Sequence, residues 1–118
     1  MDINKLTQKS QEAFYEAQNI AIRRGHQEVN TEHLSLALIS QENGLIPNLL
    51  NKIGVPVNNL LKAIESELDK KPRVSGSGQE VGKIYVSQNL SQVLAKAEDE
   101  AKMLKDEYIS VEHLLLAI

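Results

Sequence analysis

Two Glu-His pairs, Glu32-His33 and Glu112-His113, are the residues of this sequence best suited to chemistry. Histidine is the usual residue for acid–base catalysis near neutral pH and for metal binding, so each pair is a candidate for either role. A zinc-binding helix has the order His-Glu-x-x-His, which neither pair has. Duplication of a helical unit explains the recurrence of the Glu-His pair better than chemistry does, with each histidine at the same position in the first turn of its own helix. We therefore predict no catalytic residue and no metal site, and a stand-alone small helical enzyme that uses the Glu-His pairs is the less favoured alternative.

Residues 78–84 come close to a phosphate-binding loop but lack two of its requirements. Such a loop has four residues between its glycines and a Ser or Thr after its lysine. Here three residues separate Gly78 from Gly82, and Ile84 follows Lys83. We interpret the segment as a flexible linker and predict no cofactor in this chain. The remaining histidine, His26, is expected in a solvated loop.

The composition excludes several classes of protein. The 118 residues suit one globular domain, and the net charge of −3 with only three Tyr and one Phe argues against a nucleic-acid partner. The absence of cysteine excludes disulfides, thiol catalysis and Cys-based zinc sites. The first residues lack a secretion signal, and no run approaches the roughly 18 apolar residues of a membrane span. We expect a cytoplasmic protein with no membrane partner.

Apolar residues recur at steps of three and four along most of the chain, which predicts an all-α fold with no strand. Asn30 and Ser110 are expected to cap helices, because their short side chains can accept a hydrogen bond from a free backbone N–H. Pro47 and Pro56 are expected to open helices, and Gly25 and Gly54 to end them. The predicted helices cover 3–24, 31–41, 47–53, 56–69, 87–104 and 111–118, with a loop at 72–85.

The strongest signal in the sequence is an internal repeat. Val-Asn-Thr-Glu-His-Leu-Ser-Leu-Ala-Leu at 29–38 matches Ile-Ser-Val-Glu-His-Leu-Leu-Leu-Ala-Ile at 109–118, an offset of 80 from His33 to His113. The offset holds back through Ala17 and Ala97 to Gln8 and Gln88. Repeats of this kind indicate a duplicated structural unit. We predict one domain over 1–118, a pseudo-two-fold helical bundle with repeat one at 1–70, a Ser/Gly linker at 71–85 and repeat two at 86–118.

The second repeat is shorter than the first. Helices predicted over about 45–68 follow the first copy, and at the same offset their counterparts would occupy about 125–148. The leucine run 114–116 needs cover, because each buried leucine contributes about 1.5–3 kcal/mol. We therefore expect repeat two to be truncated and the native domain to continue for about 30 residues. An unchanged unfolding midpoint in a chain extended by that length would contradict this expectation.

Five segments carry a resemblance that covers essentially the whole chain. The sequence is similar to the N-terminal (Clp repeat) domains of ClpB-type AAA+ disaggregase chaperones. The segments that carry this similarity are 4–13, 25–29, 72–76, 85–90 and 105–113. The resemblance implies a module that binds unfolded or aggregated client proteins and passes them to the pore of its own hexameric AAA+ ring. ATP and Mg²⁺ would belong to motor domains that this chain does not contain, as would a coiled-coil middle domain.

Related ClpA and ClpC unfoldases share the double repeat but usually have a shorter connection between its copies. The long Ser/Gly linker here favours ClpB. The alternative is an adaptor- or substrate-docking N-domain of a ClpC/ClpA-type unfoldase.

The resemblance also implies a small polar patch beside an apolar groove, and its polar positions match Thr7, Asp106 and Glu112. Each also has a purely structural interpretation. Thr7 falls in the opening turns of the first helix, Asp106 in the turn after Leu104, and Glu112 at a helix start, where a carboxylate is favourable without any partner. Both interpretations stay open at this point, and the resemblance assigns no residue of the apolar groove.

Overall fold

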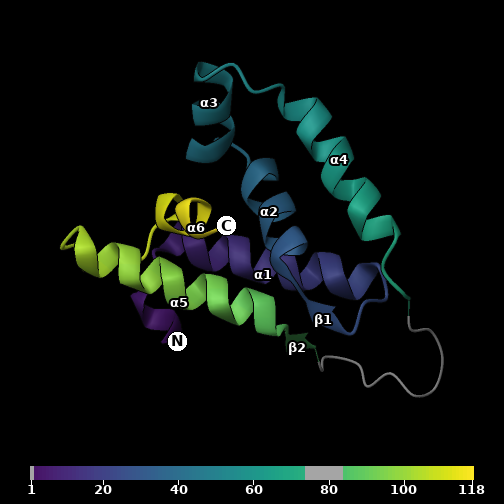
Figure 1. Ribbon diagram of the computed structural model, residues 1–118, viewed down its shortest axis with the longest axis horizontal. Coiled ribbons are helices and arrows are strands. Elements are labelled where there is room, and N and C mark those ends of the chain that lie inside the picture. Colours follow the sequence, from purple (N-terminus) through teal and green to yellow (C-terminus); the bar gives the residue numbers. More distant parts are fainter. Residues whose placement is uncertain (1, 74–83) are drawn as a thin grey trace.

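Helices account for nearly all regular structure in residues 2–73 and 84–118, which are those that the computed structural model describes (Figure 1). The predicted all-α class is confirmed. In chain order the elements are η1 (Ile3–Lys5, a 3-10 helix), α1 (Gln8–Arg23), β1 (Glu28–Val29), α2 (Thr31–Ser40), α3 (Leu45–Lys52), α4 (Val57–Asp69), β2 (Tyr85–Val86), α5 (Gln88–Met103) and α6 (Val111–Ala117).

The predicted helix over 3–24 is interrupted at Leu6, so that prediction is wrong there. Leu6 is extended, with φ −77° and ψ 140°, and forms a parallel bridge with Ile109. Thr7 then begins α1 as its N-cap, because its side-chain oxygen accepts a hydrogen bond from the backbone N–H of Ser10 at 3.2 Å. The apolar pattern did not reveal the break, because Ile3 and Leu6 both pack against the same core as α1.

A small parallel sheet is present where we predicted no strand. In it, Glu28 of β1 lies opposite Tyr85 of β2, and Val29 lies opposite Val86. Each strand has two residues, which is too few for an alternating pattern to be visible in the sequence. The predicted loop is therefore wrong at Tyr85, and its residues 74–83 lie outside the described part of the chain.

The sequence repeat is reproduced in the helix boundaries. Helices α1 and α5 each have 16 residues and begin and end 80 positions apart, and α2 and α6 begin 80 positions apart. Thr7 and Ser87 are the equivalent N-caps, and each side chain accepts a backbone N–H three residues later. Helix α1 packs on α2, and α5 packs on α6. The matching alanines at these contacts are all buried: Ala17, Ala21, Ala97 and Ala101.

The two repeats meet through a pair of equivalent backbone contacts. The N–H of Ser87 donates to the carbonyl of Val29 at 3.0 Å, and the N–H of Thr7 donates to the carbonyl of Ile109, also at 3.0 Å. At the offset of 80, Thr7 is equivalent to Ser87 and Val29 is equivalent to Ile109. Exchanging the two repeats therefore converts one contact into the other. This is the relation that a pseudo-two-fold axis between the repeats produces.

Helices α3 and α4 break the symmetry of the bundle. Pro47 lies within the first turn of α3 and Pro56 is the N-cap of α4, positions where a missing backbone N–H costs no helical hydrogen bond. Helix α4 packs on α2 and α3 contacts α6. The equivalent leucines of the two repeats also differ: Leu36 of α2 is 8% exposed, whereas Leu116 of α6 is 66% exposed.

Candidate functional site

Each repeat places a histidine at the third position of a helix, where it completes a capping box. In α6 the backbone N–H of Ser110 donates to Nδ1 of His113 at 2.8 Å. In α2 the backbone N–H of Asn30 donates to Nδ1 of His33, also at 2.8 Å. These bonds satisfy N–H groups that would otherwise lack a partner next to a helix start. The two histidines thus occupy the same structural position, as predicted.

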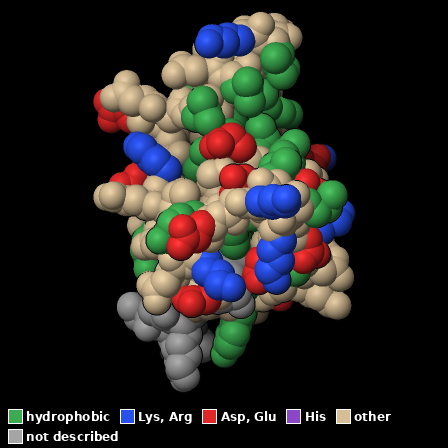
Figure 2. Space-filling model, turned by 90° about the vertical axis from the view of Figure 1, so that its left-hand side faces the viewer, with side chains coloured by type: hydrophobic (Ala, Val, Ile, Leu, Met, Phe, Trp, Pro, Cys, Tyr) green, Lys and Arg blue, Asp and Glu red, His purple; other side chains and the backbone are tan. Residues whose placement is uncertain are grey.

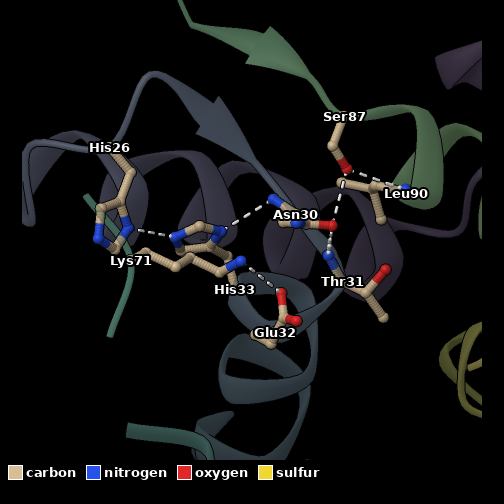
Figure 3. A network of polar contacts seen from close by, with 8 residues as sticks. All are labelled: His26, Asn30, Thr31, Glu32, His33, Lys71, Ser87 and Leu90. Atoms are coloured by element: carbon tan, nitrogen blue, oxygen red, sulfur yellow. Dashed lines mark hydrogen bonds and ion pairs between the residues drawn. The ribbon is translucent and has the colours of Figure 1, made fainter. Parts of the chain in front are cut away.

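His26 does not lie in a solvated loop, and that prediction is wrong. The residue is only 4% exposed, and its Nδ1 contacts Nε2 of His33 at 2.8 Å (Figure 3). Burial lowers the pKa of His33 to about 4, and the nearby positive charge of Lys71 acts in the same direction. Burial also lowers the pKa of His26, as do Arg24 and Lys71. Both rings are therefore neutral near pH 7.

Asn30 connects this network to the second repeat. Its Oδ1 accepts hydrogen bonds from the Thr31 backbone N–H and from the Ser87 hydroxyl, each at 2.8 Å. The Ser87 hydroxyl oxygen in turn accepts the backbone N–H of Leu90 at 3.0 Å. Figure 3 shows this line of contacts from His26 through His33 and Asn30 to Ser87. The network accounts for His26 and His33 as structural groups.

Asp106 occupies the position in repeat two that His26 occupies in repeat one. Its Oδ2 lies 2.9 Å from Nε2 of His113, and its side chain is 50% exposed. Its backbone N–H donates to the carbonyl of Ala101 at 2.8 Å and closes the turn after α5. Lys105, just before it, has a positive φ of 58°. Asp106 therefore shapes this turn and also presents a carboxylate at the surface.

The structure bonds the backbone of Thr7 to the segment of chain that carries the other two predicted site residues, Asp106 and Glu112. The backbone of Thr7 is bonded to Ile109, as described above, and Ile109 lies between Asp106 and Glu112 in the chain. Glu112 is exposed in the first turn of α6 and precedes His113, the hydrogen-bond partner of Asp106. Thr7 also caps α1, which supports its structural interpretation.

A small apolar cavity lies between the two repeats. It has a volume of about 70 Å³ and is lined by Ile3, Leu6, Phe14 and Leu94. Phe14 and Leu94 are 80 positions apart, so the cavity is lined by equivalent residues of the two repeats. Leu6 adjoins Thr7 and pairs with Ile109. Sequence reasoning assigned no groove residue, although the repeat offset between Phe14 and Leu94 was a usable signal.

A second apolar area lies on the outer side of α3 and α6. Figure 2 shows hydrophobic side chains gathered in the upper part of that face, at the level of α3, with acidic and basic groups more frequent below. The exposed large hydrophobic residues here are Leu45 and Leu49 of α3, Ile53 just after it, and Leu116 of α6. Unlike the cavity, it has no pair of equivalent residues from both repeats.

Within 2–73 and 84–118, no three His, Asp or Glu side chains are grouped so that they could hold a metal ion. Over the same residues, no helix combines the length and apolar character needed to cross a membrane.

Comparison with known proteins gives consistent matches over the whole chain. The model of the Clp repeat (R) N-terminal domain matches residues 5–118. The chain is 54% identical over 118 residues to the chaperone protein ClpB of Nitratidesulfovibrio vulgaris, covering 100% of this chain and 14% of that protein. The match is to the N-terminal part of that relative.

Solved structures agree with the fold. The N-terminal domain of the ClpV1 ATPase from E. coli is similar with a TM-score of 0.85 and 25% identity, covering 98% of this chain and 68% of that one. A ClpV N-domain in complex with a VipB peptide is similar with a TM-score of 0.77 and 25% identity, covering 98% and 68% of the two chains. The chain belongs to the Clp repeat (R) N-terminal domain family.

Proposed function

We propose that this chain is the N-terminal module of a cytoplasmic ClpB-type chaperone and that it binds unfolded or aggregated client proteins without catalysis of its own. In this proposal, a hexameric ring of ATP-driven AAA+ domains outside this chain receives the client. Membership of the family and 54% identity to a ClpB support the assignment. The observation that supports the proposal is the apolar cavity lined by Ile3, Leu6 and the equivalent residues Phe14 and Leu94. Thr7, Asp106 and Glu112 are proposed as its polar rim.

The proposed contact combines an apolar and a polar part. One apolar client side chain enters the cavity formed by Ile3, Leu6, Phe14 and Leu94, a contact favoured by removing apolar surface from water. The exposed carboxylates of Asp106 and Glu112 then attract backbone N–H groups or basic side chains of the client. A ClpV N-domain with a bound VipB peptide has the same fold, which supports peptide binding as a use of this architecture.

Binding of this kind is expected to be weak and tolerant of sequence. A cavity of about 70 Å³ takes only the end of one side chain, and full burial of a large apolar side chain contributes about 1.5–3 kcal/mol. Several modules displayed on one ring would compensate, because a client held by one copy meets the others at high effective concentration.

The test is a titration of fluorescein-labelled, reduced and carboxymethylated α-lactalbumin, a permanently unfolded protein, with this chain. Glu112→Gln should weaken binding several-fold, because it removes a rim charge. Glu32→Gln is the matched control, since Glu32 holds the equivalent position in repeat one and is paired there with Lys71 at 3.5 Å. Equal effects of the two variants, or no saturable binding to the unmodified chain, would contradict the proposal.

A further inference from the structure

Asp106 and His113 form a hydrogen-bonded pair in which both ring nitrogens of His113 have a partner. His113 is 4% exposed, and its Nδ1 receives the Ser110 backbone N–H at 2.8 Å. Because Nδ1 acts as an acceptor, the neutral ring carries its proton on Nε2. That N–H donates to Oδ2 of Asp106 at 2.9 Å. A buried and fixed ring thus directs one donor at a surface carboxylate.

The carboxylate is anchored through one oxygen only. Among the described residues, the Asp106 side chain forms one hydrogen bond, to His113, and it is 50% exposed. Its Oδ1 therefore remains available to a ligand. Glu107 and Glu112 are exposed nearby in the chain, and Lys105 is the one basic residue between 104 and 112. The local charge is suited to a basic partner.

Repeat one shows that the fold does not require a carboxylate at this position. His33 makes the same capping bond, at the same 2.8 Å, with His26 in place of Asp106 as the partner of its Nε2. His26 is buried, whereas Asp106 is exposed. The two repeats share the capping histidine, and repeat two adds a surface anion whose position is fixed by it.

We infer that His113 is a positioning residue for client recognition, which holds Asp106 so that its free oxygen binds Lys or Arg side chains flanking an apolar client segment. The inference rests on the proposed function and names the class of client. Repeat one has no equivalent group, so recognition of the basic side chain is confined to repeat two. The arrangement reduces the conformational freedom that the carboxylate would lose on binding.

The experiment uses two fluorescein-labelled peptides with the same Leu/Phe core, one flanked by Lys and the other by Gln. His113→Asn keeps an acceptor near the place of Nδ1 and removes the donor to Asp106. His33→Asn is the matched control in repeat one. Dissociation constants are measured by anisotropy for the unmodified chain, both single variants, Asp106→Asn and the double variant, with thermal midpoints for each.

For the Lys peptide, Asp106→Asn should weaken binding about 5-fold and His113→Asn about 3-fold. In the Asp106→Asn background, His113→Asn should add less than about 1.5-fold, which is the coupling expected when one residue acts through the other. His33→Asn should leave binding unchanged, and the Gln peptide should respond little to any variant. If His113→Asn does not fold, His113→Gln, a standard capping-box residue, is used in the same cycle.

Three results separate the inference from the function on which it rests. If the unmodified chain binds neither peptide, the proposed function fails and the inference with it. If Asp106→Asn weakens binding but His113→Asn has no effect, or has its full effect without Asp106, the positioning role is overturned and the function stands. If both peptides bind equally and respond equally, the basic client class is wrong.

Discussion

Nδ1 of His26 lies 2.8 Å from Nε2 of His33, and both imidazole rings are buried. Nδ1 of His33 accepts the backbone N–H of Asn30, so the neutral ring carries its proton on Nε2 and donates it to His26. A second proton on His33 would occupy Nδ1 and break its hydrogen bond with the Asn30 N–H. A proton on Nδ1 of His26 would point at the N–H of His33, so that two donors would face each other. The pair is compatible with two neutral rings and with no additional proton.

This relationship predicts that the protein loses stability in mild acid. Burial lowers the pKa of His33 to about 4 from an ordinary 6.5, so between these values the unfolded chain binds more protons than the folded chain. The contribution is complete above about pH 7 and is lost as the pH falls towards about 4. The free energy of unfolding from urea titrations should fall by about 2 kcal/mol more between about pH 7 and pH 5 than in His33→Asn. Equal losses in the two proteins would contradict the prediction.

His26→Asp provides a second check of the same pair, because it copies the arrangement of repeat two into repeat one. A carboxylate beside Nε2 favours the protonated ring, so the pKa of His33 should rise above about 5 in this variant. Proton NMR titration of the His33 ring measures it directly. A pKa that stays near 4 would show that the His26 ring does not help to set it.

Replacing Lys105 with glycine is predicted to stabilise the protein at the turn after α5. Lys105 has a φ of 58°, and its counterpart in repeat one is Gly25, with a φ of 72°. A left-handed conformation costs a side chain about 1 kcal/mol, and glycine avoids this strain but gains freedom in the unfolded chain. Lys105→Gly should therefore raise the free energy of unfolding by about 0.5–1 kcal/mol. A loss of stability in urea titration would show that the Lys105 side chain makes a compensating contact.

Thr7 is predicted to have two separable roles. As the N-cap of α1, its replacement by alanine should cost about 1 kcal/mol of stability. Ser87→Ala is the matched control, because Ser87 caps α5 in the same way.

Both alanine variants should lower the midpoint, but only Thr7→Ala should weaken binding of carboxymethylated α-lactalbumin. Thr7→Ser, which keeps the hydroxyl, should restore both properties. If Ser87→Ala weakens client binding as much as Thr7→Ala does, the effect at Thr7 is one of stability alone.

The features that sequence analysis predicted correctly depend on local pattern. The helix pairs and the caps Asn30 and Ser110 follow from periodicity and from side chains that bond their own backbone. The place of His33 and His113 followed from the repeat, because an offset of 80 carries a structural position from one copy to the other. These signals are contained within short stretches of chain.

The features that were missed depend on contacts between distant segments. The bridge between Leu6 and Ile109 ends the helical pattern at Leu6, but a single residue pair has no periodicity to detect. The burial of His26 depends on its contact with His33, and no pattern in residues 24–28 predicts it. Likewise, the cavity exists because Phe14 and Leu94 meet when the repeats associate, which no single segment encodes.

The central claim is that clients bind in the cavity between the repeats and not on the apolar surface of α3. Ile3→Asp places a charge in the lining of the cavity, whereas Ile53→Asp places the same charge on a side chain that is 66% exposed after α3. The two variants are compared by anisotropy titration of labelled carboxymethylated α-lactalbumin, after circular dichroism has shown that both are folded. We expect Ile3→Asp to weaken binding about 10-fold or more, because a carboxylate is costly in an apolar contact, and Ile53→Asp to bind like the unmodified chain. Binding that survives Ile3→Asp and is lost in Ile53→Asp would contradict the account.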